Sequence, residues 1–405
     1  MNDRQLLGDL RVVEAATFVL GPAAGTVLSD FGADVVHVEH PAIGDAYRYL
    51  QHLKPLPECD HNYPWILTSR NKRSIAIDLK QAEGRAVLQD LVRGADVFIT
   101  NYHPSVLAAL GLQWQDLEPL NPRLVYACAS GYGHVGDEVE KPGYDATAWW
   151  ARSGLMDSVR PAGGEYGLAT PAMGDHPSSL ALFGAIMLAL YERERSGRGG
   201  RVHTSLLANG AWANSVYLQA ALCGAKSYVA PSHTSTPNAL VNHYTCQDGR
   251  ALYLAMVQEA VEWARLTEAI ARPELRDDPR FRELPERRAN AGALTELLDG
   301  VFAAAPLEHW RQALDRHKVT FGIVARTEDL PEDAQMNANG VFRAIEGDPD
   351  GLRTGDSPVH FDGIDKRPPG RAPEIGEHSV EILEGLGYRT EHIEQLCRSG
   401  AVRAH

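Results

Sequence analysis

Short apolar runs alternate with amphipathic stretches along the first third of the chain, and this pattern predicts an α/β fold. Residues 10–14 (LRVVE) have the pattern of a buried strand, and they are followed by a turn and a helix with its apolar positions on one side. A second parallel strand, GADVVHVE, ends at Glu39, and further strands are predicted at residues 74–79, at residues 96–100 and within NPRLVYACASGYG. Open α/β sheets place their ligand sites at the ends of such strands.

The most strongly apolar stretch belongs to the segment PAMGDHPSSLALFGAIMLALYERERSGRG, residues 171–199. We expect Asp175 or His176 at the N-cap, Pro177 at the first helical position, and a helix that runs to about residue 194. The first-turn N–H groups and the helix dipole favour a negative charge, so Asp175 is expected to be a carboxylate. This local pattern alone does not separate a catalytic aspartate from an ordinary helix cap.

The second half of the chain predicts a separate, smaller α/β domain. An apolar helix is expected over residues 206–222, and the weakly patterned connector at residues 223–237 marks a domain boundary. A hairpin with the turn QDGR follows, and then three helices, at residues 259–270, 294–302 and 307–317. We therefore predict a large domain that begins with residues 1–225 and a small domain at residues 226–320. Residues 321–405 are expected to return to the large domain and to end in a C-terminal helix.

Composition excludes several classes of function. The 405 residues favour two domains or one large domain with an insertion, and the formal net charge of −14 argues against nucleic acid or an anionic membrane as a partner. The five cysteines are scattered without CxxC spacing, which indicates neither disulfides nor a metal site and favours a reducing cytoplasm. The N-terminus lacks a signal-peptide pattern, and no apolar run is long enough to span a membrane.

Three local features are candidates for chemistry. The first turn, FVLGPAAG, lacks the GxGxxG fingerprint, which argues against a dinucleotide and hence against a dehydrogenase. Arg70, Lys72 and Arg73 form a cationic turn that would suit phosphates, although a solvated turn explains it equally well. Tyr144, Trp149 and Trp150 lie shortly before the Asp175 segment and would either line an acyl pocket or pack in the core.

Nine segments of the chain resemble, in the same order, the family III (CaiB/BaiF) CoA-transferases. This group includes formyl-CoA transferase, carnitine-related, 2-hydroxyacyl and phenyllactate CoA-transferases, and the related α-methylacyl-CoA racemases. The resemblance covers nearly the whole chain. Its segments are LLGDLRVVEAATFVLGPAAGTVLSDFGADVVHVEHPAIGD, SRNKRSIAIDLK, DVFITNYHPSVLAALGL, NPRLVYACASGYG, KPGYDATAWWARSGLM, PAMGDHPSSLALFGAI, RSGRGGRV, PNALVNHYTCQDGRALYLAM and APEIGEHSVEIL.

The resemblance implies site residues. The family's catalytic aspartate, in a GD motif before a long apolar helix, corresponds to Asp175. The family's CoA-contacting positions correspond to Phe18, Val19, Leu20, His40, Arg73, Ile77, Asn101 and Tyr102. An arginine is common in the family where His40 stands, and another occurs in some members where Ala109 stands, so phosphate contacts would shift to Lys72, Arg73 or other groups. The tetraglycine loop of the best-known transferase has no counterpart at residues 220–260.

The resemblance also implies a mechanism and an architecture. CoA would move from an acyl-CoA to a free carboxylic acid through mixed anhydrides and an aspartyl-CoA thioester, with no permanently bound cofactor or metal and with coenzyme A as part of the substrate. The fold would be α/β, with a large Rossmann-like domain and a smaller α/β domain, in an interlocked homodimer. The substrate pocket would include Tyr144, Trp149, Met173 and His176, which favours an aromatic or branched acid over formate or oxalate.

Two alternatives remain on this fold. The racemases pair the GD aspartate with a histidine in a GHD segment, but this chain reads Gly143-Tyr144-Asp145, and a tyrosine with an ordinary pKa near 10 is a poor base. His176, beside Asp175, keeps racemisation open. The other alternative is a noncatalytic acyl-CoA-binding protein in which Asp175 serves only as a helix cap.

Overall fold

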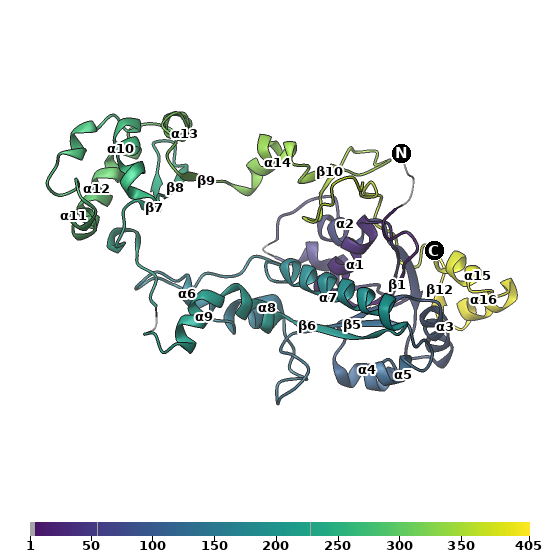
Figure 1. Cartoon of the computed structure of the whole chain (residues 1–405). Coiled ribbons are helices and arrows are strands. Elements are labelled where there is room, and N and C mark those ends of the chain that lie inside the picture. The colour runs from purple at the N-terminus through teal and green to yellow at the C-terminus, as the bar shows by residue number, and fades with distance from the viewer. Residues whose placement is uncertain (1–4, 55, 227) are drawn as a thin grey trace. The chain divides into compact units, whose positions relative to one another are not determined.

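The computed structural model describes residues 5–54, 56–226 and 228–405, and the chain divides into two compact units (Figure 1). The large unit comprises the chain up to residue 156 together with residues 168–224 and 337–405. The small unit comprises residues 157–167 and 225–336. The small domain expected at residues 226–320 lies within the small unit.

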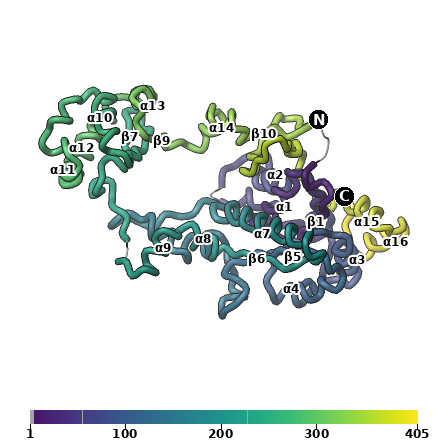
Figure 2. Tube along the Cα trace, viewed as in Figure 1, coloured from purple at the N-terminus to yellow at the C-terminus, as the bar shows by residue number. Residues whose placement is uncertain are grey.

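A seven-stranded sheet forms the centre of the large unit, in the order β12-β3-β2-β1-β4-β5-β6. All neighbouring strands pair in parallel except β12, which pairs antiparallel with β3, so the end of the chain returns to the edge of the N-terminal sheet (Figure 2). The strands are β1 (Arg11–Ala15), β2 (Asp34–Glu39), β3 (Arg73–Ile77), β4 (Val97–Thr100), β5 (Val125–Ser130), β6 (Gly200–Ser205) and β12 (Val402–Arg403).

Helices cover both faces of this sheet (Figure 1). On one face α1 (Leu20–Asp30) packs against α7 (Asp175–Ser196), and their side chains share a core with Val12, Val35 and Val125. The other face is covered by α3 (Ala82–Arg93), α4 (Pro104–Leu110), α5 (Trp114–Leu117), α15 (Ser379–Gly385) and α16 (Thr390–Arg398). Burial on both faces explains the continuous apolar runs of the central strands.

Shorter elements complete the large unit. The prediction of one helix over residues 206–222 is wrong, because the helix is interrupted at Asn214 and forms two helices. The sequence did not predict this break, since the apolar pattern continues through it and neither a glycine nor a proline stands at that position. The remaining elements are α2 (Tyr63–Ser69), α8 (Leu206–Ala213), α9 (Ser215–Leu222), β10 (Phe342–Ala344), β11 (Arg353–Gly355), a 3₁₀ helix at Ala46–His52 and a π-helix at Asp145–Ala151. Two short helices, α6 (Leu155–Ser158) and α14 (Ala334–Ala338), contain the points where the chain passes from one unit to the other.

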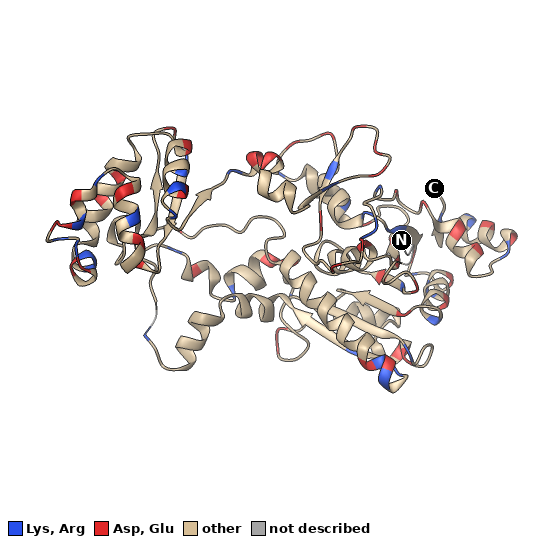
Figure 3. Ribbon diagram, turned by 45° about the horizontal axis from the view of Figure 1, so that its top comes forward, with Lys and Arg blue, Asp and Glu red and all other residues tan. Residues whose placement is uncertain are grey.

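The small unit has its own sheet and core. Its antiparallel strands, β7 (Val241–Thr245), β8 (Ala251–Ala255) and β9 (Phe321–Val324), pack with helices α10 (Glu259–Ala269), α11 (Leu284–Ala289), α12 (Ala291–Phe302) and α13 (Leu307–Arg316). Acidic and basic residues are intermixed along these helices (Figure 3). Over the described part of the chain, no helix is long and apolar enough to cross a membrane.

Candidate active site

A cavity of about 510 Å³ opens in the large unit where β1, β4 and β5 end. Its wall contains the turn before α1, the loop before α4, the residues around Tyr144 and the carboxylate-bearing residue Asp175 at the start of α7. This is the position at which an open parallel sheet places its ligands. The cavity brings together seven of the residues that the sequence nominated, namely Phe18, Val19, Leu20, Asn101, Tyr102, Tyr144 and Asp175.

Asp175 is the first residue of α7, and Gly174 is the N-cap. The prediction that Asp175 or His176 occupies the N-cap is therefore wrong, and Pro177 is the third helical residue rather than the first. Because the N-cap is a glycine, it has no side chain that could cap the helix. Gly174 is required here, because a Cβ on it would lie 2.5 Å from Cγ of Trp149. The backbone therefore packs directly on the indole, and the Asp175 carboxyl is free to face the cavity.

The carboxyl of Asp175 is not held fully ionised. Burial and the nearby Asp145 raise its pKa to about 7, although the helix start was expected to keep it ionised. The physical reason is that loss of water and a second acidic group outweigh the partial charge of the first turn. Asp145 is anchored close by, since its Oδ2 accepts the Gly174 N–H at 3.5 Å. A carboxylate with such a raised pKa is a stronger base, and hence a better nucleophile, than an ordinary aspartate.

The turn between β1 and α1 forms the wall near Asp175 and is tightly constrained. Phe18 has a left-handed backbone with φ of +62°, which is uncommon for a bulky residue. Asn101 accepts the Thr17 N–H at 2.9 Å and donates to the Thr17 carbonyl at 2.7 Å, while Asp45 accepts the Phe18 N–H at 3.3 Å. Within the described residues, no recorded hydrogen bond uses the N–H of Val19 or Leu20. Both residues line the cavity and stand at the start of α1, where N–H groups have no partner within the helix.

The basic residues expected to contact phosphate lie outside the cavity. The Lys72 side chain is completely buried, and its Nζ contacts both carboxylate oxygens of Glu14 at 2.9 Å and the Pro22 carbonyl at 2.6 Å. Arg73 pairs with Asp34 and Glu381. Lys72 is therefore not available to a ligand in this structure, because its charge balances a carboxylate in the core. Arg73 remains partly exposed.

Two other predicted CoA contacts also lie outside the cavity wall. Ile77 is 1% exposed and belongs to the core beneath the sheet. His40 is exposed, and its Nδ1 accepts the N–H of Ala42 at 3.1 Å. The structure thus brings the first turn and the Asn101 loop together around Asp175, but it does not bring His40 or Ile77 into the same cavity.

The predicted acyl pocket is only partly assembled. Trp149 and Trp150 are buried and stacked on each other, so Trp149 supports the Gly174 turn instead of lining the cavity. Met173 is 40% exposed and does not line the cavity either. Tyr144 does, and its ring meets that of Phe18 edge-on at 6.1 Å.

His176 lines a separate cavity of about 260 Å³. Burial and the charge of Arg70 lower the pKa of its imidazole, which is therefore neutral at physiological pH. Although it follows Asp175 in sequence, His176 does not share a cavity with it.

The sequence reasoning missed the part of the cavity beneath the end of β5. Tyr126 and Cys128 line it from the strand, and Arg201 contributes a guanidinium that lies 3.4 Å from Nδ1 of His134. Burial, His203 and Arg201 lower the pKa of His134 to about 4. Because Tyr126 and Cys128 are two apart, their shared face could have been read from strand periodicity. The placement of His134 and Arg201 has no local signal.

Comparison with known proteins agrees with this geometry. The model of the family described as CoA-transferase family III matches residues 7–379. The chain is 30% identical to (R)-2-hydroxy-4-methylpentanoate CoA-transferase of Clostridioides difficile, covering 98% of this chain and 100% of that protein. It is 28% identical to cinnamoyl-CoA:phenyllactate CoA-transferase of Clostridium sporogenes, covering 98% and 97%. The crystal structure of a CAIB/BAIF family protein from Brucella suis superposes with a TM-score of 0.85 at 29% identity, covering 95% of this chain and 100% of that one.

Proposed function

The chain belongs to CoA-transferase family III, and we propose that Asp175 carries CoA between an acyl-CoA thioester and a free carboxylic acid. The observation that supports this proposal is the position of Asp175 in the cavity, directly after the N-cap Gly174 and close to Asp145. A carboxylate attacks a thioester readily, because the CoA thiolate is a good leaving group.

The proposed reaction has four balanced steps. The Asp175 carboxylate attacks the acyl carbonyl, a C–O bond forms, the C–S bond breaks, and CoA leaves as a thiolate from a mixed anhydride. The thiolate then attacks the Asp175 carbonyl, which releases the first acid as its carboxylate and leaves an aspartyl-CoA thioester. An incoming carboxylate displaces the thiolate to form a second anhydride. The thiolate attacks the new acyl carbonyl, which yields the new acyl-CoA and the Asp175 carboxylate.

Each of these steps passes through an oxyanion that needs hydrogen-bond donors. We assign this role to the N–H groups of Val19 and Leu20, which line the cavity and have no recorded partner in the described part of the chain. Asn101 and Tyr102 line the same cavity, and we propose that they contact CoA. We do not propose a CoA contact for Lys72, because its buried amine is paired with Glu14.

For the transferred group, we propose a branched or aromatic acid. The aromatic rings of Phe18 and Tyr144 meet at the cavity wall that also holds Asp175. The two relatives named above act, by their names, on a branched 2-hydroxy acid and on an aromatic one.

A homodimer is also part of the proposal. Large apolar side chains on α8 and α9 are strongly exposed in the single chain, with Trp212 at 80%, Val216 at 78% and Leu222 at 72%. Such a surface normally contacts a partner, and a second copy of this chain is the partner we expect. Sedimentation analysis should therefore give twice the mass of one chain.

We favour transfer over both alternatives. Racemisation was kept open by His176, and this histidine lies in a separate cavity from Asp175. A purely structural Asp175 was expected to be the N-cap of α7, but the N-cap is Gly174 and Asp175 is the first helical residue.

The test is intact-protein mass spectrometry after incubation with a panel of acyl-CoAs, including 2-hydroxy-4-methylpentanoyl-CoA and cinnamoyl-CoA. We expect a CoA-sized adduct that is lost on borohydride reduction and absent from Asp175→Ala. The donor that gives the most adduct identifies the preferred acyl group. If no donor labels the wild type and a 2-methylacyl-CoA instead exchanges its α-hydrogen, the transfer proposal is wrong.

A further inference from the structure

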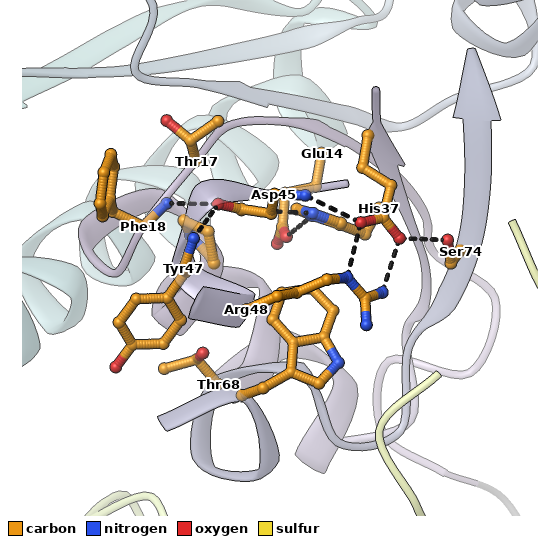
Figure 4. Close-up of polar contacts among 12 residues, drawn as sticks. Glu14, Thr17, Phe18, His37, Asp45, Tyr47, Arg48, Thr68 and Ser74 are labelled. Carbon is orange, nitrogen blue, oxygen red and sulfur yellow. Dashed lines mark hydrogen bonds and ion pairs between the residues drawn. The ribbon is translucent and has the colours of Figure 1, made fainter. Parts of the chain in front are cut away.

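A chain of buried charged side chains leads from the core of the large unit to the turn before α1 (Figure 4). It begins with the Lys72–Glu14 pair, continues through His37, whose Nδ1 lies 2.7 Å from Glu14 Oε1, and reaches Asp45, whose Oδ2 lies 3.4 Å from His37 Nε2. Each of these four residues is no more than 4% exposed. None of them lines the cavity.

The charges in this chain alternate in sign. Burial would raise the pKa of Glu14, but Lys72 and His37 lower it below its usual value, so Glu14 is ionised. Burial likewise opposes protonation of His37, but its contacts with Asp45 and Glu14 raise its pKa to about 9. His37 is therefore cationic at neutral pH, and its charge faces Asp45. A buried carboxylate such as Asp45 needs this kind of support to stay in place.

Asp45 uses its other oxygen to hold the turn that forms the cavity wall. Its Oδ1 accepts the Phe18 N–H at 3.3 Å and the Tyr47 N–H at 2.9 Å. Phe18 is the residue with the left-handed backbone, and an uncommon conformation of this kind persists only where its surroundings impose it. The next two N–H groups along the chain are those of Val19 and Leu20, so the conformation of Phe18 sets the direction in which they point.

We propose that Asp45, supported by His37 and Glu14, is a positioning residue for the transfer reaction: it holds Phe18 left-handed, and so directs the N–H groups of Val19 and Leu20 toward the oxyanion formed at Asp175. This inference rests on the proposed function. Asp45 itself touches neither substrate nor Asp175. Its effect should therefore appear in the chemical steps rather than in the binding of CoA.

The experiment compares the turnover rate of CoA transfer, the rate of Asp175 adduct formation and the Kd for CoA in a set of full-length variants. Asp45→Ala removes the hydrogen-bond acceptor of the Phe18 N–H. We expect turnover to fall about 100-fold, because a misplacement of reacting groups by about 1 Å has an effect of this size, and we expect the Kd for CoA to change less than about threefold. Asp45→Asn keeps an Oδ1 acceptor and should lose less than about fivefold. Asp356→Ala removes another buried carboxylate, paired with Lys366 at 2.8 Å, and controls for loss of stability alone.

A second substitution separates positioning from general support. Glycine adopts a left-handed backbone without strain, so in a Phe18→Gly background the effect of Asp45→Ala should shrink from about 100-fold to less than about tenfold. If Asp45→Ala does not fold, Asp45→Leu takes its place, because it fills a similar volume without an acceptor.

The outcomes distinguish this inference from the proposed function. If the wild type forms the Asp175 adduct but Asp45→Ala is equally fast, or if Asp45→Ala and Asp356→Ala lose the same activity, the positioning role is wrong. It is also wrong if Phe18→Gly leaves the effect of Asp45→Ala unchanged. If the wild type forms no adduct with any donor, the proposed function itself has failed.

Discussion

The raised pKa of Asp175 predicts that replacing it with asparagine changes how stability depends on pH. In the folded protein burial and Asp145 raise this pKa from 3.8 to about 7. The folded state thus binds the proton more tightly than the unfolded state does, so the contribution to stability is present at low pH and is lost as the pH rises toward and through 7. Since each tenfold change in proton affinity corresponds to ~1.4 kcal/mol, ionising Asp175 costs the folded state up to about 4 kcal/mol.

Between pH 5 and pH 8 the wild type should lose about 2–3 kcal/mol of unfolding free energy through this one group. Asp175→Asn cannot ionise, so relative to the wild type it should gain this amount over the same interval. The assay is urea unfolding of both proteins at several pH values. Asp145→Asn is the matched control: it removes the neighbouring charge but leaves the burial, so the pH dependence should weaken without disappearing.

The same ionisation should control the first chemical step. Because the carboxylate is the nucleophile that we propose, the rate of adduct formation from an acyl-CoA should rise with pH through about 7. In Asp145→Asn this rise should move to lower pH. Parallel stability curves for the wild type and Asp175→Asn, or an adduct rate that does not change from pH 5 to pH 8, would refute the reasoning.

Two further predictions concern the residues around the site. Gly174→Ala places a Cβ 2.5 Å from Trp149, so we expect the unfolding free energy measured in urea to fall by ~1–3 kcal/mol and adduct formation to be at least tenfold slower. The control is Gly184→Ala, within α7, whose Cβ meets nothing within 4 Å, so its stability should be unchanged or higher. Lys72→Met removes one of the two cationic partners of the buried Glu14 and leaves His37, so it should cost ~1–3 kcal/mol, yet calorimetry should show an unchanged Kd for CoA. A Kd weakened tenfold or more with little change in stability would instead restore a phosphate-binding role for Lys72.

Much of the fold could be predicted because it depends on local pattern. The strand expected at residues 10–14 is β1 at Arg11–Ala15, and the helix expected from Pro177 to about residue 194 is α7 at Asp175–Ser196. Both belong to elements whose buried positions repeat with a strand or helix period, and such repeats are visible in a short window of sequence. Family motifs also located Asp175 and the first turn, and the cavity contains both.

Sequence alone could not assign partners to the charged and aromatic residues. Lys72 and Glu14 are 58 residues apart, and only the pairing of distant strands shows that the lysine neutralises a carboxylate in the core instead of a phosphate. Trp149 supports Gly174 from 25 residues earlier in the chain, where the sequence indicated a pocket wall. In both cases the residue type was informative, but its role depended on which distant segment packs against it.

The sequence by itself thus determined the α/β class, the positions of the main strands and helices, the family and the aspartate at the centre of the site. Only the tertiary structure decided that Gly174 and not Asp175 is the N-cap of α7, that Asp145 and burial shift the pKa of Asp175, and that Asp45 accepts the Phe18 N–H in the turn before α1. The division has a physical cause. Secondary structure follows from periodicities a few residues long, whereas the charge state and orientation of a side chain depend on solvent exclusion and on charges brought close by distant segments.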